Sequence, residues 1–105
     1  FMGGMGGMDG LEIRSIRRNF EISQKELGDI LGVSSMTILR WEKESAKPTG
    51  LIEQILKICL AVSRDGRMAG NVHRLVRTRT EAAAVLWYIL NAVYASKLKG
   101  DERVR

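Results

Sequence analysis

Apolar positions recur three and four residues apart along the first two thirds of the chain, which is the spacing of helices with one buried face. The pattern predicts four short helices, over about residues 10–19, 24–31, 35–43 and 50–63. A small polar residue that can accept a hydrogen bond from the first turn precedes each of them, namely Asp9, Ser23, Ser34 and Thr49. Glu26 follows Ser23 at the capping-box spacing, and Gly32 is expected to end the second helix in a left-handed conformation.

The last third of the chain has a less regular pattern. Asp65 and Gly66 indicate a break, and residues 67–79 are ambiguous, with a short helix expected at about 72–77. Thr80 and Glu81 then open a strongly apolar helix that is expected to reach about Lys97. Because no strand pattern and no internal repeat are found, the sequence predicts an all-α fold of five or six helices.

The segment from Gln24 to Lys43 has the residue types that two helices joined by a tight turn require. Gly28 is small where the helices are expected to approach each other, and Gly32 suits a positive φ in the turn. The positions that would seal the two helices together are all apolar: Leu27, Leu31, Val33, Ile38 and Trp41. This agreement predicts a helix-turn-helix whose second helix, at residues 35–43, is the recognition helix.

These residues resemble the Xre/Cro-type, or phage-repressor, family of helix-turn-helix proteins. The resemblance lies in four short segments, Ser23–Leu27, Leu31–Ser34, Thr37–Ile38 and Arg40–Glu42. The segment Lys47–Gly50 and the leucine-rich helix after it are similar to the DNA-binding domains of HigA- and MqsA-type antitoxins. The resemblance covers about residues 13–60 and implies a compact repressor-like domain that binds double-stranded DNA.

The resemblance implies a DNA-binding role for six positions: Gln24, Ser34, Ser35, Met36, Thr37 and Arg40. Ser35, Met36 and Arg40 would face base edges in the major groove, and Gln24 would contact a phosphate and brace the recognition helix. Ser34 and Thr37 would cap that helix or contact the DNA backbone. The chemistry agrees, since an arginine can donate two hydrogen bonds to guanine and a methionine can pack on a thymine methyl group.

The resemblance also pairs Arg17 with Glu42, which would tie the first helix to the end of the recognition helix. A structural ion pair is the expected role of these two side chains.

Composition favours a polyanionic partner. The 105 residues include 17 Lys and Arg against 12 Asp and Glu, which gives a formal net charge of +5. Basic residues that could contact phosphates follow the recognition helix or lie in the last third of the chain: Lys43, Lys47, Arg74, Arg77 and Arg79. The alternative is that the three arginines merely solvate a connector.

Several functions are not expected from this sequence. A single cysteine, Cys59, allows no internal disulfide and no common zinc set, and its place on an apolar stripe predicts an inert, buried thiol. His73 is expected at the surface. We find no nucleophile with a base, no paired acids and no phosphate loop, so no catalytic residues, metal, cofactor or enzyme activity are expected. The low cysteine count and the lack of a secretory pattern favour the cytoplasm.

Three segments are expected in the chain. Residues 1–8 would be a flexible arm or a cloning remnant, residues 9–65 the DNA-binding domain, and residues 66–105 a helical extension. Between Ala82 and Ala95 the extension has one polar residue, Asn91, and this stretch is too short for a bilayer, which needs about 20 apolar residues. We expect it to bind a second copy or another partner, and not a membrane, through Trp87, Leu90 and Tyr94.

The sequence therefore predicts a sequence-specific, homodimeric DNA-binding transcriptional regulator, a repressor. Two alternatives remain. In the first, the protein is an antitoxin that binds its operator and neutralises a toxin through the C-terminal helix. In the second, it is an interaction adaptor in which the helix-turn-helix is only a scaffold.

Overall fold

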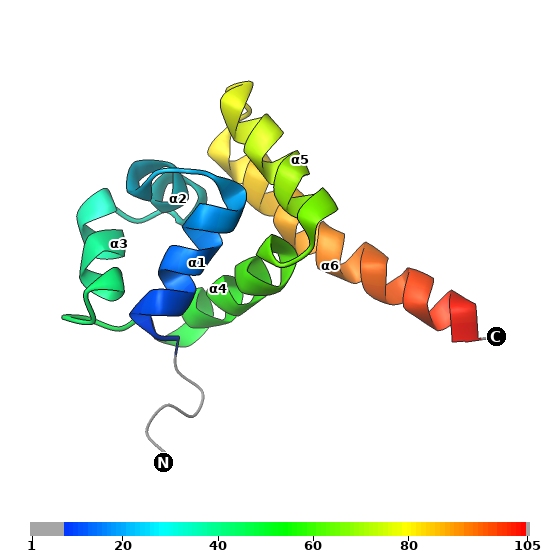
Figure 1. Ribbon diagram of the computed structural model, residues 1–105, viewed down its shortest axis with the longest axis horizontal. Coiled ribbons are helices and arrows are strands. Elements are labelled where there is room, and N and C mark those ends of the chain that lie inside the picture. Colours follow the sequence, from blue (N-terminus) through cyan, green and yellow to red (C-terminus); the bar gives the residue numbers. More distant parts are fainter. Residues whose placement is uncertain (1–7, 105) are drawn as a thin grey trace, which may run out of the picture.

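Six α-helices make up the part of the chain that the computed structural model describes, which is the backbone of residues 8–104 and the side chains of residues 8–94. In chain order they are α1 (Gly10–Phe20), α2 (Gln24–Leu31), α3 (Ser35–Glu42), α4 (Gly50–Ser63), α5 (Gly66–Arg77) and α6 (Ala82–Val104). No strand occurs among these residues, which confirms the all-α prediction. Figure 1 shows α2 and α3 on one side of α1, and α5 and α6 on the other.

Three of the four predicted caps hold the first turns of their helices. Asp9 Oδ1 accepts a hydrogen bond of 2.8 Å from the Glu12 N–H, and Ser23 Oγ accepts one of 3.0 Å from the Glu26 N–H. Both glutamates accept a bond in return from the backbone of the capping residue, so both helices begin with complete capping boxes. The hydroxyl of Ser34 likewise accepts from the Thr37 N–H, at 3.1 Å.

The fourth predicted cap, Thr49, is confirmed only in part. Thr49 has the extended backbone of an N-cap and directly precedes α4, but its side chain makes no capping hydrogen bond. The helix starts where expected without a side-chain cap, and it packs on α1.

The core is built around α1, which packs against α3, α4 and α5. Ile13, Ile16 and Phe20 of α1 are completely buried, as the spacing predicted. The other elements add at least one buried side chain each, including Leu27, Ile38, Leu56, Val72 and Ile89. Burial of a large aliphatic or aromatic side chain contributes about 1.5–3 kcal/mol, so one shared core holds all six helices together.

The turn between α2 and α3 has the geometry that its glycines require. Gly32 ends α2 with φ of 78°, a left-handed conformation that costs glycine nothing sterically. A Cβ atom on Gly28 would lie 2.5 Å from the backbone oxygen of Val33. Leu31 and Val33 are partly buried against the core, whereas Ile38 and Trp41 are buried, so the predicted contact between the two helices is confirmed.

The main differences from the sequence prediction lie in the last third of the chain. The fifth helix begins at Gly66 and not near Val72, because Asp65 is its N-cap and accepts hydrogen bonds of 3.0 Å from the backbone N–H groups of Arg67 and Met68. The aspartate that indicated a break thus starts a helix. The sixth helix continues past Lys97 to Val104, since no proline interrupts it.

Met8 and His73 also lie in surroundings that differ from the sequence prediction. Met8, assigned to the flexible arm, is 4% exposed and belongs to the core, whereas residues 1–7 lie outside the described residues. His73 is only partly exposed, with Nδ1 at 3.1 Å from the carbonyl oxygen of Phe20 and 3.2 Å from that of Glu21, so the expected surface position is only partly right. Its imidazole therefore contacts the last carbonyl groups of α1.

The side chain of Glu42 joins three helices. It is almost completely buried at the end of α3, and it accepts hydrogen bonds of 2.6 and 2.9 Å from the guanidinium group of Arg17 on α1. Gln24, the first residue of α2, donates a further bond of 3.2 Å to it. The predicted pairing of Arg17 with Glu42 is therefore confirmed, in a bidentate geometry that fixes orientation as well as distance.

A matched pair of glycine substitutions tests the close approach of α2 and α3. We expect Gly28→Ala to destabilise the protein by about 1–3 kcal/mol, because the added methyl group meets a backbone oxygen that cannot move away easily. Gly70→Ala in α5 is the control, since its Cβ would meet nothing within 4 Å, and should stabilise by about 0.5–1 kcal/mol. Urea unfolding of both variants measures the two effects, and equal effects would contradict the proposed crowding.

A second prediction concerns the pH dependence that Glu42 gives to stability. Burial by itself would raise the pKa of Glu42, but the hydrogen bonds from Arg17 and Gln24 and the nearby guanidinium charges outweigh it and hold this pKa below its ordinary value. A carboxylate of this kind stabilises the fold fully above its unfolded pKa of about 4.3, and the contribution is lost as the pH falls through the folded pKa.

We therefore expect Glu42→Gln to lower the free energy of unfolding at neutral pH by about 1.5–3 kcal/mol, the range for hydrogen bonds to a charged group. The difference from the wild type should shrink in acid, when Glu42 itself becomes protonated. Glu81→Gln, which removes an exposed carboxylate, should show neither effect. Unfolding curves collected from neutral to acidic pH test this, and a constant difference between wild type and Glu42→Gln would refute it.

Candidate nucleic-acid interface

The outer face of α3 carries polar and flexible side chains above a buried inner face. Ser35, Met36 and Arg40 are exposed, whereas Ile38 and Trp41 on the other side of the same helix belong to the core. In Figure 1, α3 lies at one edge of the fold, with this side of the molecule unobstructed by other helices. The three side chains predicted to contact bases are therefore all accessible on one element.

One hydrogen bond links the start of α2 to the end of α3. Gln24 donates one Nε2 proton to Glu42, so the side chain predicted to brace the recognition helix does contact it. An amide nitrogen has a second proton, which remains for another acceptor. The first backbone N–H groups of a helix lack partners within the helix, and they favour an anion near its N-terminus.

The hydroxyl groups at the start of α3 serve the helix itself. Ser34 Oγ accepts from the Thr37 backbone and lies 3.1 Å from Thr37 Oγ1. The capping role predicted for Ser34 is thus confirmed. A contact of either hydroxyl with DNA stays a prediction.

The basic residues predicted to contact phosphates fall into two groups. Lys43 and Lys47 are exposed at the end of α3 and in the loop that follows it. The other three lie on α5 or in the loop after it, on the side of α1 opposite to α3 in Figure 1: Arg74, Arg77 and Arg79. The first group adjoins the recognition helix, and the second does not.

Two of the three arginines on the far side already have protein partners. Arg77 forms an ion pair with Glu26 on α2, and Arg74 donates a hydrogen bond to Asn71 one turn earlier. Both side chains are therefore oriented by the protein, and their role toward phosphate remains a prediction.

Sequence patterns missed two contacts that position the site. Glu44 Oε2 accepts a hydrogen bond of 3.0 Å from the Gly10 N–H, which ties the loop after α3 to the start of α1. Arg14 Nε lies 3.6 Å from Glu42 Oε1 and adds a second positive charge to that carboxylate. The only signal for the first contact was Glu44, an acidic residue after the recognition helix. Its partner lies 34 residues earlier in the chain, so no local pattern identified it.

The outer face of α6 is mostly apolar, with Asn91 as an exposed amide beside the apolar side chains. Trp87, Leu90 and Tyr94 have exposures of 67%, 36% and 63%, and they recur at intervals of three and four residues along one side of the helix. We call these three residues the α6 stripe. The opposite side of α6 is buried through Val85 and Ile89. In the described part of the chain, no helix combines the length and apolar character needed to cross a membrane.

The other groups that could carry chemistry are the single cysteine and the side chains that can bind metals. Cys59 is buried in α4, and burial raises the pKa of its thiol to about 12, so it stays protonated and unreactive as expected. Within residues 8–94, His, Cys, Asp and Glu side chains form no group of three or more that could hold a metal ion.

Comparison with models of protein families matches residues 13–59 to the helix-turn-helix family. Searches of curated proteins and of solved structures found no significant match. The matched segment runs from the first buried isoleucine of α1 to Cys59 in α4, so it contains the helix-turn-helix and the cluster around Glu42. It does not confirm the likeness to HigA- and MqsA-type antitoxins. The match supports the resemblance to the Xre/Cro-type helix-turn-helix family over residues 13–59, which make up somewhat less than half of the chain.

Proposed function

We propose that this protein is a sequence-specific transcriptional repressor that inserts α3 into the major groove of double-stranded DNA and acts as a homodimer in the cytoplasm. The match of residues 13–59 to the helix-turn-helix family supports a DNA-binding regulator and not an enzyme. The observation that carries the finer proposal is the outer face of α3, where Ser35, Met36 and Arg40 are exposed above a buried apolar face.

Arg40 is the main candidate for base recognition. Its guanidinium group can donate two hydrogen bonds to O6 and N7 of guanine, and such a pair contributes about 1–3 kcal/mol of discrimination. Met36 offers an apolar contact for a thymine methyl group, and Ser35 can bond to almost any base edge and therefore specifies little.

Phosphate contacts near the end of α3 would set its position in the groove. Gln24 offers its second Nε2 proton at the start of α2, and Lys43 and Lys47 offer charges after α3. These contacts carry no sequence information, but they determine register and affinity and make binding sensitive to salt.

A second copy of this chain is the partner that we propose for the α6 stripe. From Ala82 to Tyr94 the helix has no charged residue, and Ala83 and Ala84 are exposed and small enough to let another helix approach closely. Two copies related by a two-fold axis would bury the same stripe on each other. Dimers of helix-turn-helix domains bind two half-sites about 34–36 Å apart, which raises both affinity and specificity.

The function is tested by selecting bound duplexes from a random DNA library at near-physiological salt. We expect enrichment of an inverted repeat whose half-sites lie about one helical turn, 10–10.5 base pairs, apart. A single enriched half-site would show sequence recognition without the dimer. Failure to enrich any sequence would contradict the proposal and leave the adaptor alternative.

Arg40→Ala tests the assignment of base recognition in the same assay. We expect it to weaken binding to the selected operator by about 5–150-fold, the equivalent of about 1–3 kcal/mol, and to relax the preference at one base pair per half-site. Binding to random DNA should change little. Arg67→Ala, which removes an exposed arginine from α5, is the control. Equal losses on operator and random DNA would instead make Arg40 a phosphate contact.

Trp87→Ser tests the dimer. Buried tryptophans at interfaces contribute about 2 kcal/mol or more, so we expect at least about thirtyfold weaker self-association by sedimentation equilibrium. Leu51→Ser removes another exposed apolar side chain, on α4, and should leave association unchanged. A monomeric wild type would refute the dimer and leave the α6 stripe for a different partner, as in the antitoxin alternative. Copurification of a toxin with the chain would support that alternative.

A further inference from the structure

Most of the positive charge of the chain lies outside the helix-turn-helix. The segment from Arg64 to Arg79, which contains α5, has five arginines and one acidic residue, so it carries a net charge of +4 out of the +5 of the whole chain. The segment from Asp9 to Ser63, which contains the recognition helix, has eight basic and eight acidic residues and therefore no net charge. Attraction to a polyanion without regard to its sequence thus comes mainly from the segment around α5.

Two of these arginines lie on the outer side of α5. Arg67 and Arg74 are exposed and seven residues apart, which places them on the same side of the helix, about 10.5 Å apart along its axis. Gly70 lies between them, and a Cβ atom there would meet nothing within 4 Å, so the surface between the two side chains is open. Arg64, just before α5, is also exposed and lines a cleft together with Gly70. We call these three arginines the α5 arginine face: Arg64, Arg67 and Arg74.

The positive charge of this face is largely uncompensated by the protein. Among the described side chains, no carboxylate forms a salt bridge with any of its three arginines. Arg74 donates a hydrogen bond to the side chain of Asn71, which carries no charge. Two acids lie near the face: Asp65, whose carboxylate accepts hydrogen bonds from the first turn of α5, and Glu21, which lines the same cleft as Arg64. Three arginines against these two acids leave the face with an excess of positive charge for an external anion.

The surroundings of the face favour a nucleic-acid backbone over a membrane or a protein. The apolar side of α5 is turned into the molecule, where Ala69 and Val72 are buried and Leu75 packs against the core. A helix that lies on a lipid surface needs an exposed apolar side, and the centre of a protein interface is likewise apolar. The α5 arginine face has neither, whereas guanidinium groups match phosphate oxygens in a bidentate geometry.

The face is separated from the recognition helix by the body of the molecule. In Figure 1, α3 and α5 lie on opposite sides of α1. A straight duplex on the outer side of α3 therefore has α1 and α2 between itself and α5. DNA that contacts the α5 arginine face is then a second segment, and not a continuation of the first.

We propose that the α5 arginine face binds the phosphate backbone of a second DNA duplex, without sequence preference, while α3 binds the operator. The part of α3 in this pair rests on the proposed function, whereas binding by the α5 arginine face does not. A protein with both surfaces brings two separate DNA segments together.

The first test uses a random-sequence duplex, which requires no operator. Arg67→Gln/Arg74→Gln removes two charges from exposed helix positions and introduces a residue that favours helices, so the fold should be kept. Each phosphate contact contributes about 0.9 to the slope of log K against log salt, so we expect this slope to fall by about 1.8. The loss of affinity between about 50 and 200 mM salt should thus become about twelvefold smaller. Fluorescence anisotropy of a labelled duplex of the full-length chain's complex measures both quantities.

Two matched double variants separate position from charge. Arg18→Gln/Lys57→Gln removes two exposed charges from α1 and α4 and should leave the salt slope unchanged. Arg67→Lys/Arg74→Lys keeps both charges on α5 and should retain the slope of the wild type. An unchanged slope in Arg67→Gln/Arg74→Gln, or an equal fall in Arg18→Gln/Lys57→Gln, would overturn the proposal. Tighter binding to phosphatidylserine vesicles than to the duplex would also overturn it, in favour of a membrane surface.

The second test asks whether one protein holds two duplexes. The selected operator duplex is immobilised and saturated with the protein, and a labelled random-sequence duplex is then added. We expect capture of the labelled duplex by the wild type and little capture by Arg67→Gln/Arg74→Gln, with the same operator affinity in both. Equal capture by the two proteins would overturn the proposal. If no operator is selected, the proposed function fails, but the salt slopes still decide whether the α5 arginine face binds DNA.

Discussion

A buried carboxylate at the end of α3 determines how the first three helices are arranged. Glu42 is 7% exposed, and an ionised group in such a place is costly unless hydrogen bonds and opposite charges compensate for the lost water. Arg17 from α1 and Gln24 from α2 provide that compensation with three hydrogen bonds. Because each donor comes from a different helix, the carboxylate is satisfied only when all three helices are in place.

This constraint explains how so short a recognition helix can be ordered. An isolated helix of eight residues is unstable in water, where about 12–15 residues are marginal. In α3, the buried side chains of Ile38, Trp41 and Glu42 provide the stability. The exposed residues on its outer face are therefore not needed to hold the helix in place. Substitution of Ser35, Met36 or Arg40, the residues proposed to contact bases, should therefore cost the fold little.

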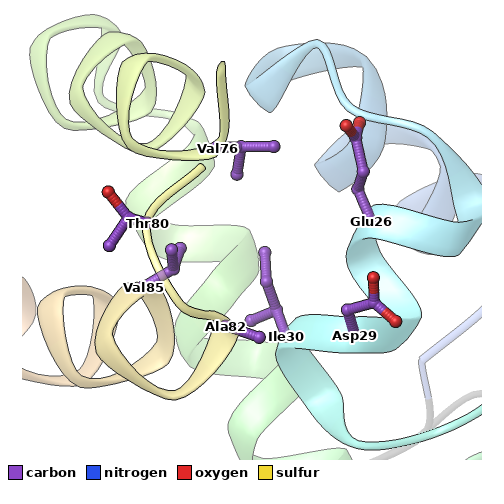
Figure 2. Close-up of a pocket in the computed structure, with 7 residues that line it drawn as sticks. All are labelled: Glu26, Asp29, Ile30, Val76, Thr80, Ala82 and Val85. Atoms are coloured by element: carbon purple, nitrogen blue, oxygen red, sulfur yellow. The ribbon is translucent and has the colours of Figure 1, made fainter. Parts of the chain in front are cut away.

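The C-terminal helices extend the domain and leave two surfaces open. One side of α6 completes the core through Val85 and Ile89, while its other side presents the α6 stripe to solvent. A helix that is apolar on both sides needs more neighbours than a small domain can supply. A cleft also remains between α2 and the α5–α6 pair, where Ile30 and Val76 face each other's helices (Figure 2).

The sequence by itself determined the elements whose signals are local. Caps at Asp9, Ser23 and Ser34, the left-handed Gly32 and the apolar spacing of α1 act within a few residues, so they predicted helix positions and the helix-turn-helix.

Tertiary structure decided what depends on residues far apart in the chain. Gly10 must be small because a Cβ atom there would collide with the backbone oxygen of Glu42, and Arg77 is directed to Glu26, 51 residues away. Met8 likewise joins a core cluster to which residues far along the chain contribute. Such contacts leave no period or motif in the sequence, since only the packing of the helices brings their partners together.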